Sequence, residues 1–134
     1  MSGTAWRYTL AGSFVFVGIT AFEQLPLLGW LGALLSLGAW AVLTRELVAA
    51  QRRREGTRPA ASAAAMGAIT GFVGALTAWL AQAANLVGAA TPAGDRFGAG
   101  LSAVGATLGL AYWPLVGALV CFGAALAFTR GARR

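Results

Sequence analysis

The chain contains no histidine and no lysine, one cysteine, and four acidic residues among 134. Without histidine or a second cysteine, it cannot build by itself a Ser-His-Asp triad, a histidine-ligated haem, a histidine metal site or an intrachain disulfide. The glycines lie at helical spacing inside apolar runs, so they do not form a phosphate-binding loop after a strand. We therefore expect no enzyme and no metal or cofactor of its own, although a lipid, quinone or pigment held by a larger complex stays open.

Charge is also scarce. Charged residues make up 10% of the chain and hydrophobic residues 58%, and the mean hydropathy is +0.71. Soluble domains carry about 25% charged residues, and a water-soluble chain of this length could not bury so much apolar surface. The composition predicts a single all-α integral membrane domain covering residues 1–134.

The apolar runs predict four transmembrane helices, and the short breaks after the first and third predict two antiparallel hairpins. Pro114 lies near the middle of the last run and is expected to kink it. A longer polar stretch, residues 46–60, separates the two hairpins as a basic cytoplasmic loop. The predicted spans are approximately residues 8–23, 27–45, 62–88 and 98–129.

The net charge of +6 comes entirely from arginine. The arginines gather at the ends of apolar runs, which indicates membrane topology and not nucleic-acid binding. With four spans, all of them except Arg96 fall on the side that holds both termini. The positive-inside rule then predicts cytoplasmic termini, in what we expect to be a bacterial inner membrane.

A stripe of small residues runs through residues 60–88 in unbroken steps of three and four, while the opposite stripe is bulky and apolar. Such helices pack backbone to backbone in membranes. The expected partner is the small stripe of the fourth span, which is lost after Pro114, or a neighbouring subunit. The predicted packing residues are Gly67, Gly71, Gly74, Ala78, Ala81, Gly105 and Gly109.

Three polar residues near span ends, Glu23, Gln82 and Asn85, allow two interpretations. In the first, Glu23 is an interfacial turn residue, and the two amides form hydrogen bonds between helices. In the second, the three residues line a polar pathway, because ionisable and polar groups at membrane depth often mark one.

Three consecutive arginines, Arg52, Arg53 and Arg54, lie in the basic loop. They are typical of an anchor at lipid headgroups, and the alternative is a docking patch for an acidic partner.

Small residues suited to helix packing are abundant in this sequence, and residues suited to catalysis or metal binding are scarce. We therefore interpret the chain as a small non-catalytic membrane subunit that packs through glycine and alanine faces into a larger complex or a homo-oligomer. Its expected partners are membrane lipids and other membrane subunits or itself, without nucleic acid. The alternative is a small multi-span transporter or channel that acts as an oligomer.

Overall fold

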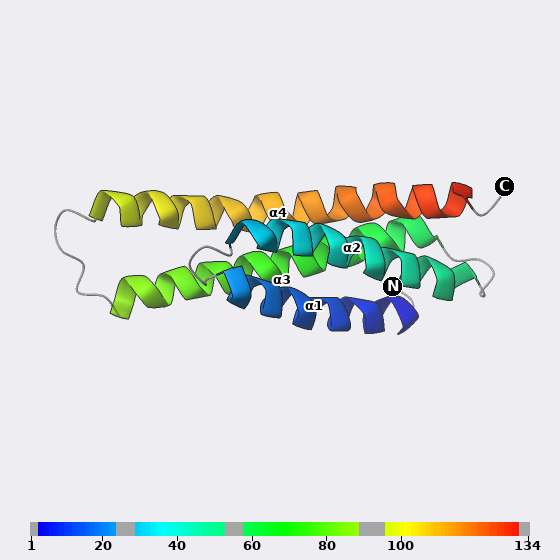
Figure 1. Cartoon of the computed structure of the whole chain (residues 1–134), viewed down its shortest axis with the longest axis horizontal. Coiled ribbons are helices and arrows are strands. Elements are labelled where there is room, and N and C mark those ends of the chain that lie inside the picture. The colour runs from blue at the N-terminus through cyan, green and yellow to red at the C-terminus, as the bar shows by residue number, and fades with distance from the viewer. Residues whose placement is uncertain (1–2, 24–28, 53–57, 89–95, 132–134) are drawn as a thin grey trace.

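The part of the chain that the structure describes forms a bundle of four helices. The computed structural model describes residues 3–23, 29–52, 58–88 and 96–131. The helices lie side by side along one long axis, and the first turn of α1 and the last turn of α4 lie at the same end (Figure 1). The predicted all-α class and the four helices are confirmed. Their bounds are α1 (Gly3–Glu23), α2 (Gly29–Arg52), α3 (Pro59–Gly88) and α4 (Arg96–Gly131).

The helices extend beyond the predicted spans at several ends. α1 begins five residues before residue 8, and α2 continues seven residues past residue 45, so part of the predicted basic loop is helical. A helix can continue beyond its apolar run, because charged side chains at its end keep their charged groups in water. α3 begins at Pro59, a residue suited to the first helical turn because its missing N–H would have no partner there.

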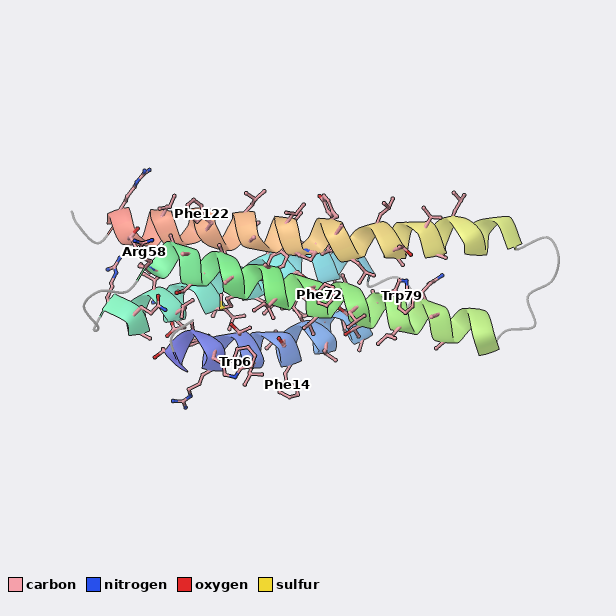
Figure 2. The ribbon with its side chains drawn as sticks, turned by 180° about the vertical axis from the view of Figure 1, so that it is seen from behind. Trp6, Phe14, Arg58, Phe72, Trp79 and Phe122 are labelled. Atoms are coloured by element: carbon pink, nitrogen blue, oxygen red, sulfur yellow. The ribbon has the colours of Figure 1, made fainter. Side chains whose placement is uncertain are left out.

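Over the described residues, three of the four helices are long and apolar enough to cross a membrane. The qualifying segments are Leu31–Arg52 in α2, Pro59–Ala84 in α3 and Gly100–Gly131 in α4. α1 is not among them, although its 21 residues correspond to about 32 Å of helix. Large apolar side chains point away from the bundle on both its edges, including Trp6 and Phe14 on α1 and Phe122 on α4 (Figure 2).

Pro114 lies inside α4, and the helix continues through it from Arg96 to Gly131. Proline removes one backbone donor from the helix ladder. Despite this lost donor, Pro114 does not divide the fourth span into two helices.

The two hairpins differ in length. α3 and α4 make the most extensive contact between helices, and they extend beyond α1 and α2 at the end of the bundle away from the termini (Figure 1). The buried core lies in the half that all four helices share, around Trp40, Leu47, Met66 and Cys121. Between Gly100 and Val116, by contrast, no side chain of α4 is fully buried. We call this segment the distal half of α4.

Candidate functional site

α3 and α4 approach each other closely at a position where glycine faces glycine. A Cβ atom added to Gly67 would overlap the carbonyl group of Gly117, and a Cβ on Gly117 would overlap the carbonyl of Gly67. Four residues along α3, a Cβ on Gly71 would lie 2.5 Å from the carbonyl oxygen of Trp113 and 3.2 Å from the nitrogen of Pro114. Real Cβ atoms do not tolerate such distances, so only glycine at these positions allows the two backbones to lie this close.

Trp40 of α2 is packed into this seam and is 1% exposed. Its ring carbon Cζ2 is 2.8 Å from the position that a Cβ on Gly117 would take, so Gly117 also makes room for the indole. The ring stacks on Phe16 of α1, with centroids 4.9 Å apart and planes at 28°, and its centroid lies 6.5 Å from that of Trp113 on α4. Its N–H donates to Thr70 on α3 at 2.9 Å. Trp40 therefore links its own helix to the other three.

A small cavity of about 50 Å³ lies beside this aromatic cluster. Its wall carries the hydroxyl-bearing residues Thr20 and Ser36 among apolar neighbours, and both are buried. A cavity of this size with polar groups has room for a few water molecules. Three of the predicted packing residues, Gly71, Gly74 and Ala78, also line it.

The predicted stripe on α3 divides between several neighbours. Gly67 and Gly71 face α4, whereas a Cβ on Gly74 would lie 3.5 Å from Phe16 and from Thr20 on α1. Ala81, further along, is half-buried. One side of α3 is therefore placed against two helices and not against one.

The sequence predicted that Gly105 and Gly109 of α4 contact the glycines of α3. The structure shows that they do not. A Cβ on Gly105 would meet nothing within 4 Å, and one on Gly109 would meet only Trp113 of the same helix. The contact lies further along, at Gly117, Cys121 and the backbone of Trp113. The physical reason is axial register, which places the part of α3 containing Gly67 and Gly71 beside the second half of α4.

The small stripe of α4 is not lost after Pro114. Gly117, Cys121 and Ala125 follow it in steps of four and all three are buried. Cysteine is a small side chain that behaves as an apolar residue when buried, and counting it as small would have revealed this stripe. The notable seam residues that pattern reading missed are therefore Gly117 and Cys121.

Of the predicted polar residues, Gln82 donates from Nε2 to the hydroxyl of Ser102 on α4. The N–H of Trp79 donates to the hydroxyl of Thr107 at 3.3 Å, a second polar link between α3 and α4 in the same region. The side chains of Glu23 and Asn85 lie outside the described part of the structure. The described polar side chains here thus join two helices to each other.

The predicted basic patch is described only at its first member. Arg52 donates from Nη2 to the backbone carbonyl of Phe128, so the last residue of α2 is tied to the last turns of α4. Carbonyls at a helix C-terminus have no partner within the helix, and a cationic donor satisfies one of them. Arg53 and Arg54 lie outside the described residues.

Among the described residues, no three histidine, cysteine, aspartate or glutamate side chains come together in a group able to hold a metal ion. No family model matches the chain, and no curated protein or solved structure matches it either. The site is therefore interpreted from its geometry alone. It consists of a tight seam between two helices, an aromatic cluster packed into that seam, and a large uncovered helix surface beyond it.

Proposed function

We propose that all four helices cross a membrane and that both chain termini face the cytoplasm. α1 is long enough for a bilayer core of about 30 Å, and its outward side chains are apolar, with Phe14 78% exposed. The arginines at the start of α1 and the ends of α2 and α4 share one end of the bundle with the termini (Figure 1). The positive-inside rule assigns that end to the cytoplasm, consistent with a bacterial inner membrane.

Reporter fusions test this topology. An alkaline phosphatase domain fused after residue 134 should be inactive in the cell, and a fluorescent protein fused there should fluoresce. Fusions within 89–95 should behave oppositely. Active phosphatase at the C-terminus would contradict the proposed orientation.

We propose that the protein is a small non-catalytic membrane subunit that assembles with other membrane chains or with itself. The observation that carries the proposal is the distal half of α4, where no side chain is fully buried and the glycine at 105 has open space beside it. Leu108 is 65% exposed in this segment. Small residues beside large ones on an uncovered helix are typical of contacts between membrane helices.

Gly105→Leu separates assembly from folding. Because nothing lies within 4 Å of the added Cβ, the leucine should not disturb the isolated bundle, but it should prevent close approach of another helix. The matched control is Gly123→Leu, also at an open glycine of α4 but beside the well-packed half of the bundle. The measurement is the mass and composition of the tagged full chain after purification from its own membrane in mild detergent.

We expect the wild type and Gly123→Leu to be recovered with a stoichiometric membrane partner or as a homo-oligomer, and Gly105→Leu to be recovered alone. A wild-type chain that is monomeric without partners would contradict the subunit proposal. If such a monomer or a clean oligomer passes ions through liposomes, the result favours the transporter or channel alternative.

A further inference from the structure

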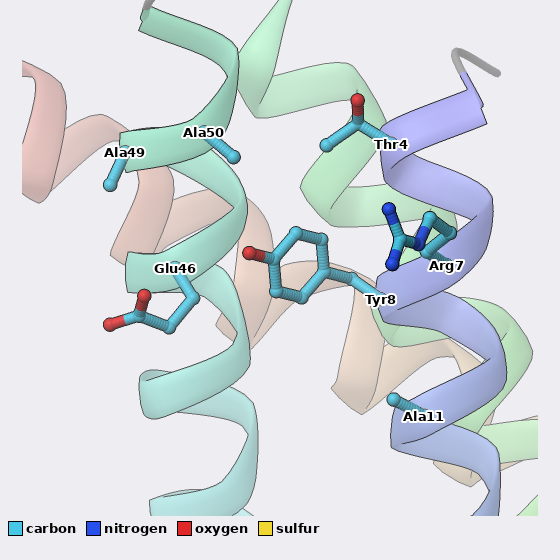
Figure 3. Close-up of a pocket in the computed structure, with 7 residues that line it drawn as sticks. All are labelled: Thr4, Arg7, Tyr8, Ala11, Glu46, Ala49 and Ala50. Carbon is cyan, nitrogen blue, oxygen red and sulfur yellow. The ribbon is translucent and has the colours of Figure 1, made fainter.

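A groove of about 760 Å³ lies between α1 and α2 at the end of the bundle that holds the termini. Figure 3 shows Tyr8 reaching from α1 toward α2, with Arg7 on its own helix and Glu46 on the facing one. Thr4 adds a hydroxyl to the α1 wall, and the small side chains of α2 keep the groove wide. The groove is therefore a polar recess and not a gap filled by packing.

The two walls carry opposite charges that do not neutralise each other directly. Arg7 and Glu46 are both exposed, and the structure has no ion pair between them. A guanidinium binds phosphate oxygens through paired charge-assisted hydrogen bonds, and a carboxylate accepts hydrogen bonds from an ammonium group. The groove thus offers a cationic contact on one wall and an anionic contact on the other, which suits a ligand that carries one anionic and one cationic group.

Beyond the groove, toward the middle of the bundle, the neighbouring exposed side chains of α1 and α2 are apolar. One turn beyond its end on each helix lie Val15 of α1 and Val42 of α2, which are 45% and 60% exposed. A further turn along α1, Gly18 has nothing within 4 Å of an added Cβ. A ligand that occupies the groove and also lies against these apolar side chains must have a charged head and an apolar tail.

The depth of the groove agrees with a headgroup position. Trp6 precedes Arg7 and is 51% exposed, and tryptophan is enriched where a membrane meets water. We propose that the groove binds a zwitterionic phospholipid with a primary ammonium headgroup, with its phosphate at Arg7 and its ammonium at Glu46. A trimethylammonium group, in contrast, is recognised by several aromatic faces, and the described lining contains a single aromatic ring, Tyr8.

The inference extends beyond the proposed subunit role and requires only that α1 and α2 lie in a bilayer. Native mass spectrometry of the full chain tests it by titration with dioleoyl-phosphatidylethanolamine, phosphatidylglycerol and phosphatidylcholine. We expect phosphatidylethanolamine to bind most tightly. Arg7→Gln should weaken its binding about tenfold, since a charge-assisted contact to phosphate is lost. Glu46→Gln should abolish the preference for phosphatidylethanolamine over phosphatidylglycerol.

Arg45→Gln is the matched control, because Arg45 is exposed and precedes Glu46 but does not line the groove. It should bind all three lipids as the wild type does, and circular dichroism should show equal helix content in every variant. Equal affinity for the three lipids, or an equal loss in Arg45→Gln and Arg7→Gln, would overturn the proposal. Displacement of the lipid by millimolar glycerophosphoethanolamine, which lacks acyl chains, would also overturn it.

Discussion

The indole N–H of Trp40 donates to the hydroxyl oxygen of Thr70 at 2.9 Å. The same hydroxyl donates to the carbonyl of Met66 at 2.9 Å, one turn earlier on α3. Both side chains are buried. The bond therefore joins α2 to α3 inside the bundle and links the first hairpin to the second.

Thr70→Val should destabilise the bundle by about 0.6 to 2 kcal/mol, the range for hydrogen bonds between membrane helices. Valine keeps the shape of threonine but leaves the Trp40 N–H without its acceptor. Unfolding in mixed micelles, followed by the loss of helix, provides the measurement. The control is Thr77→Val, because Thr77 donates at 2.8 Å to Val73 of its own helix. An equal effect of the two changes would show that the link between α2 and α3 contributes nothing of its own.

Gly117→Ala should be far more disruptive than its size suggests. The added methyl group would overlap the carbonyl of Gly67 and come within 2.8 Å of Trp40. Over-packing a core usually costs about 1 to 3 kcal/mol, and we expect more than about 3 kcal/mol here because the obstacle is backbone, which cannot change rotamer.

Gly123→Ala is the comparison for Gly117→Ala, because a Cβ there meets nothing within 4 Å. It should be neutral or stabilise α4 by up to about 1 kcal/mol, since alanine favours helix over glycine. Thermal unfolding in the same detergent measures both variants. A stable Gly117→Ala protein would contradict the close approach of α3 and α4.

The fold class could be predicted from the sequence, but the pairing of the helices could not. Long apolar runs separated by arginines and prolines are local signals, and they located all four helices, with ends that differ by up to seven residues from the predicted spans. Helical spacing also showed which side of α3 carries small residues. Helical spacing does not show how two helices are aligned along their length. The sequence therefore predicted a contact of α3 with Gly105, whereas the structure shows the contact at Gly117. The groove at Arg7 and Glu46 joins residues far apart in the chain, and no local pattern indicates it.

Arg52→Gln should loosen the end of α4. The arginine donates to the carbonyl of Phe128, and its charge also lies favourably near the negative end of the helix dipole. Hydrogen exchange of amides in the last turn of α4 should become about two- to fivefold faster, while exchange around Cys121 stays unchanged. Arg45→Gln removes an exposed arginine from the same helix without this contact. Equal exchange in the two variants would argue against a cap by Arg52.

Gly71→Ala and Gly74→Ala distinguish the two contacts made by neighbouring glycines of the α3 stripe. A Cβ on Gly71 would lie 2.5 Å from the carbonyl oxygen of Trp113, whereas a Cβ on Gly74 would meet Phe16 and Thr20 at an ordinary 3.5 Å. Gly71→Ala should therefore push α3 away from α4 and destabilise the protein by about 1 to 3 kcal/mol or more.

Gly74→Ala should instead preserve stability or increase it slightly, because the methyl group partly fills the small cavity that Gly74 lines and alanine is the better helix former. Unfolding of both variants in one detergent, with Trp fluorescence as a second reading, makes the comparison. The chain contains five tryptophans, so this reading is their summed emission, and it should change more in Gly71→Ala, where the added methyl group displaces the backbone of Trp113, than in Gly74→Ala. The opposite order of stabilities would mean that α3 uses this stripe against α1 and not against α4.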